Sequence, residues 1–245
     1  MNKVAINQSN YIPWKGYFDL MHDVDLFIFY DDVQFTKNEW RNRNRIKTPN
    51  GSQWLTIPVG DDIHRLICEV AIKDHHWQTK HWKTINQIYG KTPYFKNYRA
   101  FLEHFYLDQQ WDNLSRLNQY AITTIARGFL GIQAQFLQSS DYPKQGTNQD
   151  AVISLLKALN ADLYVSGPAA KAYLQPERFE QEGIRLVWKD YSGYPDYSQI
   201  CPPFEHHVTI LDLLLHTGPD APYYIWGWRE DKKLAHDAHR HTEAR

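Results

Sequence analysis

The sequence predicts an α/β fold with a mainly parallel, Rossmann-like sheet that carries an inserted β-hairpin and a helix-rich middle segment. The chain opens with a β-loop-α-β unit: residues 3–7 and 26–30 are strand-like, and residues 16–24 have a helical apolar pattern. Strands and helices alternate again in the second half of the chain. Such alternation is typical of parallel strands with helices on both faces.

Apolar spacing places the remaining elements. Residues 114–129 repeat apolar side chains at helical spacing, and residues 67–72 favour a further strand. After residue 74 the pattern predicts helices 75–89, 94–107, 111–130, 150–159 and 209–216, short helices from Ala169, and strands 133–138, 163–165 and 184–188. We expect a single domain over residues 1–235 with a helical insertion at about 75–131, and a disordered tail over residues 236–245.

Composition excludes several classes of protein. The 245 residues carry a net charge of −1 without a long block of one sign, which does not indicate a general nucleic-acid binder. The sequence shows neither a signal peptide nor an apolar run approaching the ~20 residues of a membrane span. Cys68 and Cys201 show no pairing pattern, which favours a reducing compartment. We therefore expect a cytoplasmic protein.

Residues 40–59 predict a β-hairpin with a row of cations. Side chains of an extended strand alternate between faces, so one face would carry Arg41, Arg43, Arg45 and Lys47. The opposite face would carry Trp40, Asn42, Asn44 and Ile46. A turn at residues 49–51 and a return strand over residues 54–59 would complete the hairpin.

The row of like charges has two explanations. It fits a phosphate-bearing ligand, because guanidinium groups bind phosphate through paired hydrogen bonds. It also fits a solvated edge strand whose charges deter aggregation. Tyr30, Asp31 and Asp32 lie just upstream and favour the ligand, since acids beside cations can act as a base or hold a metal. Ordinary turn chemistry is the alternative for these three residues.

Parallel sheets bind ligands beyond the carboxyl ends of their strands. In this sequence those ends carry Gln8 and Asn10, Tyr30 to Asp32, Ser139 to Asp141, Ser166 to Pro168, and Lys189 to Tyr191. The first loop leads to Gly16, where the backbone could approach a phosphate at the start of a helix. Close packing of that helix is an equal explanation for Gly16.

His75, His76 and His81 lie close together in sequence, as metal ligands often do. Adjacent histidines point to different faces of a helix, and no carboxylate stands at a ligand spacing from them. A packed or solvated role is therefore favoured over metal binding. The sequence indicates no metal ligands and points to no particular cofactor or oligomeric state.

With these segments in view, the chain resembles the WbqC-like family of bacterial O-antigen gene clusters. The resemblance runs from Val4 to about Gly218 and rests on NQSNYIPWKGYFDLM, YDDVQFTKNEWRNRNRIKT with WLTIPV, YVSGPAAKAYL and VTILDLLLHTG. Ser9 departs from the pattern, because the family is expected to favour proline there. The resemblance implies work on a nucleotide-linked amino sugar in the biosynthesis of surface polysaccharide such as lipopolysaccharide.

The opening unit is also similar to that of the nucleotidylyltransferase and pantoate-activating ligase superfamily. Those enzymes bind ATP phosphates with two histidines around a glycine, and Trp14 and Tyr17 stand at the matching positions here. This difference argues against adenylyl transfer, whether or not the fold is shared.

We expect a transferase that forms an amide by moving an acyl or aminoacyl group from a small acyl donor to a nucleotide-linked amino sugar. Asp31 or Asp32 would be the catalytic base. The predicted substrate-binding residues are Gln8, Asn10, Tyr11, Trp14, Gly16, Tyr30, Gln34, Lys37, Trp40, Arg41, Asn42, Arg43, Asn44, Lys47, Ser166 and Gly167. The alternatives are Mg²⁺-dependent nucleotidyl transfer by the paired aspartates, and a non-catalytic subunit that binds a nucleotide sugar.

Overall fold

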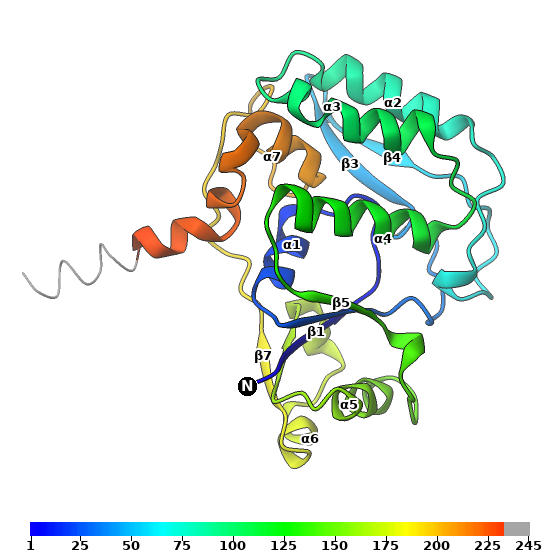
Figure 1. The fold of residues 1–245 in the computed structure, drawn as a ribbon, viewed down its shortest axis with the longest axis vertical. Coiled ribbons are helices and arrows are strands. Elements are labelled where there is room, and N and C mark those ends of the chain that lie inside the picture. The colour runs from blue at the N-terminus through cyan, green and yellow to red at the C-terminus, as the bar shows by residue number, and fades with distance from the viewer. Residues whose placement is uncertain (233–245) are drawn as a thin grey trace, which may run out of the picture.

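The computed structural model of the chain describes residues 1–232, with a five-stranded parallel sheet at its centre (Figure 1). The strand order is β5-β2-β1-β6-β7, with β1 at Lys3–Asn7, β2 at Leu26–Phe29, β5 at Gln135–Gln138, β6 at Leu163–Ser166 and β7 at Arg185–Trp188. Every neighbouring pair in it is parallel. The predicted α/β class is therefore confirmed. The predicted tail over residues 236–245 lies outside the described part of the chain.

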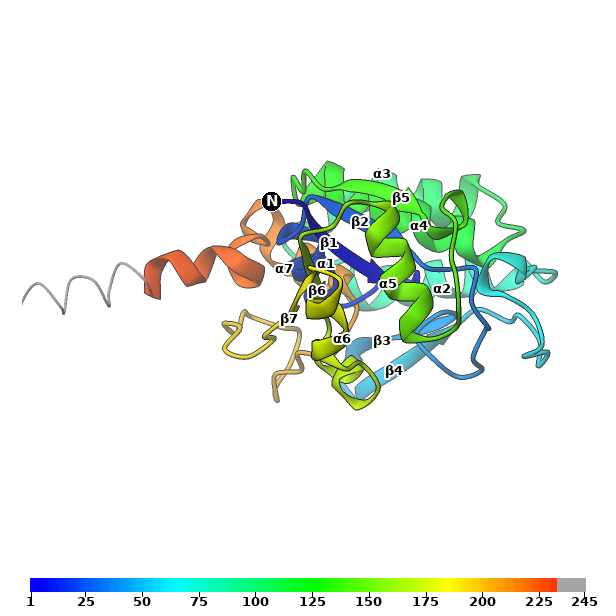
Figure 2. The ribbon, with the colours of Figure 1, turned by 90° about the horizontal axis from the view of Figure 1, so that it is seen from below.

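Helices cover both faces of this sheet. Helix α1, Lys15–His22, lies on one face, and α5, Gln149–Ala158, and α6, Pro176–Gln181, lie on the other (Figures 1 and 2). The strands serve both layers because their side chains alternate: Ala5, Phe27 and Phe29 join the core around α1, while Val4, Ile6 and Ile28 join the core around α5 and α6.

The middle of the chain is helical, as predicted. It contains α2 at His76–Tyr89, α3 at Phe95–Glu103 and α4 at Leu114–Thr124, and α7 follows later at Ile210–Thr217. Helices α3 and α4 continue as π-helical turns, and a third π-helical turn follows α7; the three span His104–Asp108, Ile125–Phe129 and Tyr223–Gly227. Short 3-10 helices lie at Ser139–Asp141, Pro168–Ala172 and Gly218–Asp220.

The predicted strand over residues 67–72 is wrong. The segment begins with a 3-10 helix at Ile67–Glu69, and Ala71 pairs with Asn113 in an isolated bridge. Val70 and Ile72 are buried on either side of the exposed Ala71, as in a strand, but Ile67 and Val70 are buried three residues apart. That spacing matches one turn of a 3-10 helix, whereas a strand would bury alternate residues.

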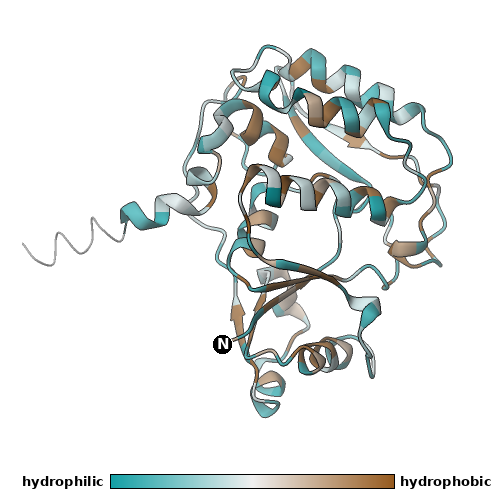
Figure 3. Ribbon diagram, viewed as in Figure 1, coloured by the Kyte–Doolittle hydropathy of each residue, from teal (hydrophilic) through white to brown (hydrophobic). Residues whose placement is uncertain are grey.

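The predicted hairpin is confirmed, with β3 at Arg43–Thr48 and β4 at Gly51–Thr56. Thr48 pairs with Gly51 across a two-residue turn, and the φ of +105° at Gly51 suits glycine. Although β3 is largely hydrophilic (Figure 3), Ile46 and Leu55 are buried in the core that contains α1. The hairpin is thus packed onto the sheet domain along one face. The single-domain division over residues 1–235 stays a prediction.

No helix within residues 1–232 is long and apolar enough to cross a membrane.

Tyr11, in the loop after β1, is fully buried and ties that loop to α2. Its hydroxyl lies 2.9 Å from His81 Nδ1 and 2.7 Å from the Tyr106 hydroxyl. Burial lowers the pKa of His81 from its ordinary 6.5 to about 4. His81 is therefore a packed, neutral side chain, the role that its sequence position favoured.

The pKa of His81 predicts a loss of stability in mild acid. The unfolded chain binds this proton near pH 6.5 and the folded chain only near pH 4, so stability present above pH 6.5 is lost as the pH falls through that interval. The loss should approach about 3 kcal/mol. Urea unfolding of the wild type and His81→Gln at pH 7 and pH 4.5 measures it.

The Gln variant carries no titrating group at this position, so its unfolding free energy should fall less between the two pH values. His64→Gln, which changes an exposed histidine, should keep the wild-type dependence. Equal pH dependence in the wild type and His81→Gln would refute a neutral, buried His81.

Candidate functional site

The loop after β1 and the base of the hairpin are tied together by backbone and amide hydrogen bonds. The Tyr11 N–H donates to the Trp40 carbonyl at 2.9 Å. The Asn44 side-chain amide donates to the Tyr11 and Ile12 carbonyls at 3.0 and 2.7 Å. The hairpin is therefore fixed against the carboxyl edge of the sheet, where ligands of parallel sheets bind.

Arg41 reinforces this junction. Its guanidinium donates to the Asn10 side-chain oxygen, and its carbonyl accepts from the Asn118 amide at 2.8 Å. Burial lowers the pKa of Arg41 from its usual value, and the nearby Tyr17, Glu39 and Asp31 oppose that effect. Arginine stays protonated despite this lowering of its pKa, so a positive charge is hydrogen-bonded to the Asn10 side chain.

A pocket of about 220 Å³ opens at this junction. It is lined by Asn10, Pro13, Trp14, Trp40, Asn44 and His207. The Trp14 and His207 rings lie 5.3 Å apart and are tilted by 31°. Rings around a few polar groups are typical of sites for sugars and nucleotide bases. Asn10, Trp14, Trp40 and Asn44 are the predicted residues that the structure brings together here.

Gly16 shapes the pocket wall rather than a phosphate site. A Cβ atom at this position would lie 2.3 Å from the Trp14 indole, which no relaxed structure allows. The Trp14 ring can therefore fold over the start of α1 only because residue 16 is glycine. Close packing, the second explanation given for Gly16, is the one that the structure supports.

His207 is the pocket residue that the sequence did not identify. Its Nδ1 lies 3.4 Å from Glu205 Oε1, and its backbone N–H donates to the same oxygen at 2.9 Å. Burial raises the pKa of Glu205, but the His207 N–H and the charge of Arg45 outweigh it and hold that pKa below its usual value. An ionised carboxylate beside Nδ1 fixes the ring and leaves Nε2 available for proton exchange.

The segment Glu205-His206-His207 was the available signal, because it places three titratable residues after a proline-rich stretch. Helix α7 explains how it reaches the pocket: the Thr209 N–H donates to the Arg45 carbonyl, and the Ile210 N–H donates to the Pro13 carbonyl, both at 2.9 Å. These bonds hold the segment against β3 and the first loop.

The arginines of β3 form a surface with two tryptophans beside the pocket. The Arg43 guanidinium lies 4.2 Å from the Trp54 ring, and Arg45 lies 5.6 Å from Trp54 and 5.9 Å from Trp40. The Trp40 and Trp54 rings are 5.5 Å apart. Arg43 and Arg45 thus share one face, as predicted, and Arg45 lies next to the Trp40 wall of the pocket.

Two details of the predicted cationic row need correction. Trp40 precedes β3 and packs with Trp54, the cross-strand partner of Arg45, and not on the face of Asn42 and Ile46. Lys47 is buried, and its Nζ donates to the Pro203 carbonyl at 2.5 Å. Lys47 therefore fixes the 203–207 segment against β3, and its ammonium is not exposed for binding a phosphate.

The paired aspartates point into separate networks. Asp31 is buried, and its carboxylate accepts from the Ser9 N–H at 2.8 Å, from the Gln119 amide at 2.9 Å and from the Ser115 hydroxyl. Asp32 instead pairs with Lys144 and accepts from the Ser139 hydroxyl. Neither carboxylate lines the pocket. Ser9 gives Asp31 a backbone donor that a proline would lack.

The other predicted site residues lie around the pocket or away from it. Tyr11 and Asn42 are buried, and the Asn42 amide donates to the Ile57 carbonyl at 3.0 Å. The Lys144 ammonium lies 5.1 Å from the centroid of the Tyr30 ring. Gln34 and Lys37 contact the 61–63 loop, through the Ile63 carbonyl and the Asp61 carboxylate. Gln34 and Lys37 therefore contact the 61–63 loop and do not line the pocket.

The ends of β1 and β6 are used by the fold. The Gln8 carbonyl accepts from the Tyr17 hydroxyl at 2.9 Å. The Ser166 carbonyl accepts from the Lys189 N–H at 2.8 Å, and the Gly167 carbonyl from the Ala170 N–H at 3.1 Å. The structure therefore does not bring the Gln8, Ser166 and Gly167 positions into the pocket.

Within residues 1–232, no group of three or more His, Cys, Asp or Glu side chains is arranged to hold a metal ion. A larger groove of about 820 Å³ lies along β6 and β7 and contains none of the predicted substrate-binding residues. We take the smaller pocket as the candidate site, because it joins the carboxyl edge of the sheet to the arginine-bearing hairpin.

Comparison with known proteins places this chain in a family. The chain is 44% identical over 227 residues to the uncharacterized protein Rv1507c of Mycobacterium tuberculosis (strain ATCC 25618 / H37Rv), which covers 92% of this chain and 98% of that protein. No solved structure matches the chain. The model of the WbqC-like protein family matches residues 8–224, a range that includes the whole pocket. The chain therefore belongs to the WbqC-like protein family.

Proposed function

We propose that this protein is a transferase that forms an amide on a nucleotide-linked amino sugar, for cytoplasmic assembly of a surface polysaccharide such as O-antigen. The observation that carries the proposal is the pocket, in which Trp14, Trp40 and His207 surround the polar Asn10. Flat rings on several sides suit a sugar or a base, which present apolar faces and polar edges.

The hairpin supplies the charge that a nucleotide diphosphate needs. Arg45 lies against Trp40, and Arg43 lies on the neighbouring Trp54. A sugar held in the pocket could therefore extend its diphosphate along this face of β3, where Arg45 can bind it through paired hydrogen bonds. One terminal nitrogen of Arg43 donates to the Asn38 carbonyl, so Arg43 would contribute mainly its positive charge. Binding of a diphosphate would explain why the arginines lie against tryptophan rings beside the pocket. A solvated edge strand would need the charges but not the rings.

His207 fits the role of the catalytic base. In the proposed reaction the amine nitrogen of the sugar bonds to the acyl carbonyl carbon of the donor, and the bond from that carbon to the leaving group breaks. The amine must lose a proton, which His207 Nε2 would accept and then pass to the leaving group. Glu205 beside Nδ1 would stabilise the protonated ring between these two steps.

A binding panel tests the substrate class. Nucleotides, uridine- and thymidine-diphosphate amino sugars and acyl donors should be compared by thermal shift, with and without Mg²⁺. We expect the amino-sugar nucleotides to raise the melting temperature most, without a need for the metal. Binding without turnover by the purified protein and any acyl donor would favour a non-catalytic subunit, and dependence on Mg²⁺ would favour nucleotidyl transfer.

Trp40→Ala should weaken nucleotide-sugar binding about tenfold, because it removes one stacking wall of the pocket. Its side chain is 38% exposed, so the melting temperature of the free protein should change little. Titration calorimetry of the wild type and variant measures the difference. Tyr173→Ala removes an exposed ring that does not line the pocket and should bind like the wild type. Wild-type affinity in a folded Trp40→Ala protein would rule the pocket out.

A further inference from the structure

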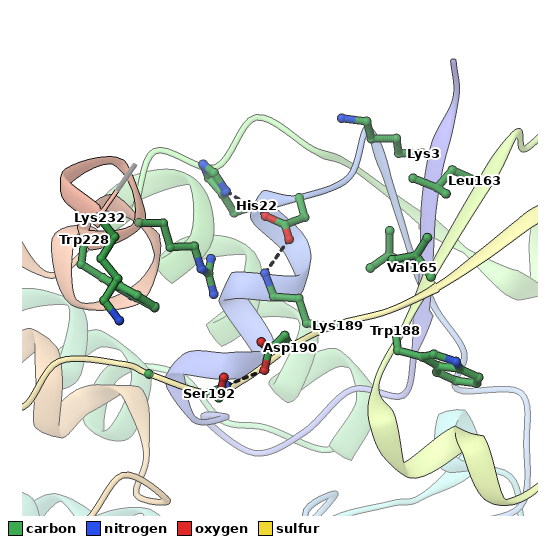
Figure 4. A pocket seen from close by; sticks show the side chains of 14 residues that line it. Lys3, His22, Leu163, Val165, Trp188, Lys189, Asp190, Ser192, Trp228 and Lys232 are labelled. Carbon is green, nitrogen blue, oxygen red and sulfur yellow. Dashed lines mark hydrogen bonds and ion pairs between the residues drawn. The ribbon is translucent and has the colours of Figure 1, made fainter. Parts of the chain in front are cut away.

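The groove of about 820 Å³ is a second concave site, formed by β6, β7, the end of α1 and the segment around Trp228. Its floor is aliphatic and includes Leu163, Val165 and Val187. Figure 4 shows Lys3 beside Leu163 and Val165 on one rim, and Lys232 beside Trp228 on the opposite rim. The volume falls within the range of pockets that bind small organic ligands.

The cations in the middle of the groove are already neutralised. Lys189 Nζ lies 2.8 Å from Asp19 and 2.5 Å from Asp23. Arg229 binds both oxygens of Asp19 at 2.8 and 2.6 Å. These paired charges are part of the wall and have little capacity left for a ligand anion.

The rims differ from the centre. Across residues 1–232, no ion pair involves the side chain of Lys3 or Lys232, and Lys232 Nζ lies 4.4 Å from the Trp228 ring. Asp190 lies between Lys189 and Ser192 in Figure 4, and its bond from the Ser192 N–H keeps its pKa below the usual value. A ligand anion would be repelled near Asp190 and attracted to either rim.

We propose that this groove binds an acyl chain that ends in a carboxylate, with the chain on the aliphatic floor and the carboxylate at the Lys3 or Lys232 rim. An aliphatic floor favours a hydrocarbon over a sugar. The rim lysines offer single ammonium charges, which suit a singly charged carboxylate, and the guanidinium of Arg229 is occupied by Asp19. Acyl binding here does not require the smaller pocket to be a transferase site.

Titration calorimetry of the full chain with dodecanoate tests the proposal. Lys3→Gln/Lys232→Gln should weaken dodecanoate binding about fivefold, because the exposed charge contact is lost at whichever rim holds the carboxylate. Dodecanol, which has the same chain without the charge, should bind more weakly than dodecanoate to the wild type and should not respond to this double substitution. Lys96→Gln, at an exposed lysine of α3, is the matched control and should bind dodecanoate normally.

Val187→Thr tests the floor, because it keeps the shape of a half-buried side chain and adds a hydroxyl. It should weaken dodecanoate and dodecanol by the same factor, about threefold to fivefold, in a protein of unchanged fold by circular dichroism. The proposal is overturned if dodecanoate does not bind the wild type, or if the lysine and valine variants bind it as the wild type does. Tighter binding of dodecyl phosphate than of dodecanoate would overturn the carboxylate assignment.

Discussion

His207→Gln should reduce the rate of amide formation by about 100-fold to 10,000-fold, the range usual for loss of a general base. Glutamine keeps a polar side chain in the pocket wall but cannot accept a proton from the sugar amine. The affinity for the nucleotide sugar should change much less, since stacking on Trp14 and Trp40 and the charges of Arg43 and Arg45 remain. Single-turnover kinetics with a saturating amino-sugar nucleotide measures the chemical step directly.

His206→Gln is the matched control, because it makes the same change one residue earlier. His206 Nε2 lies 3.4 Å from Asp196, and His206 does not line the pocket. The control should retain nearly full activity. If His207→Gln keeps more than a tenth of the wild-type rate, the base lies elsewhere, and the buried Asp31 or the Lys144-paired Asp32 becomes the group to test.

The parallel sheet was predictable because each of its strands has a local signature. Short apolar strands alternate with helices whose apolar residues recur at helical spacing, and these patterns survive in the fold because the sheet is buried on both faces. The hairpin was equally local, since a turn at residues 49–51 joins two segments of alternating character. Irregular segments carry no period, which is why the 3-10 helix at Ile67–Glu69 was mistaken for a strand.

The candidate site was predictable only in the part formed near the first loop. Asn10 and Trp14 follow β1, and their place at the carboxyl edge of the sheet is a consequence of topology. His207 reaches the same pocket through an irregular segment more than 190 residues later, held by bonds from Thr209 and Ile210. Long-range contacts of this kind have no counterpart in sequence spacing.

Several of the predicted site residues that lie outside the pocket are polar residues that brace the fold. Tyr11 and Lys47 have the chemistry of ligand-binding residues, but both are buried and engaged by protein partners, His81 and Pro203 among them. Burial of a polar group is stable when its hydrogen bonds are met inside the protein. Residue type alone does not distinguish this use from binding a substrate.

Asp19 is another polar residue whose bracing role cannot be read from its residue type. Its loss should destabilise the fold more than that of any other bracing residue. It lies on α1 among apolar neighbours and is completely buried. Its carboxylate binds Lys189 Nζ at 2.8 Å and both Arg229 nitrogens, and it accepts from the Tyr194 hydroxyl. The hydrogen bonds to Asp19 raise the pKa of Arg229. These contacts join α1 to β7 and to the segment after α7.

Asp19→Asn should lower the free energy of unfolding by about 3 to 5 kcal/mol, because it leaves the buried Lys189 with only the part-exposed Asp23 as a balancing charge and removes the partner of Arg229. Lys189 has a side chain only 4% exposed and cannot turn to water without breaking the packing of β7. Urea denaturation at pH 7 measures the loss. Asp220→Asn, at an exposed aspartate, should stay within about 0.5 kcal/mol of the wild type.

Asp19→Asn combined with Lys189→Met separates the charge effect from a packing defect. If the incompletely balanced ammonium causes the loss, the double variant should regain part of the stability of Asp19→Asn, because methionine removes the buried charge and fills a similar volume. If the introduced asparagine merely packs badly, the two substitutions should add, and the double variant should be the less stable protein. If Asp19→Asn alone loses less than about 1 kcal/mol of unfolding free energy, then Asp23 is sufficient to balance Lys189, and the Arg229 side chain becomes solvated.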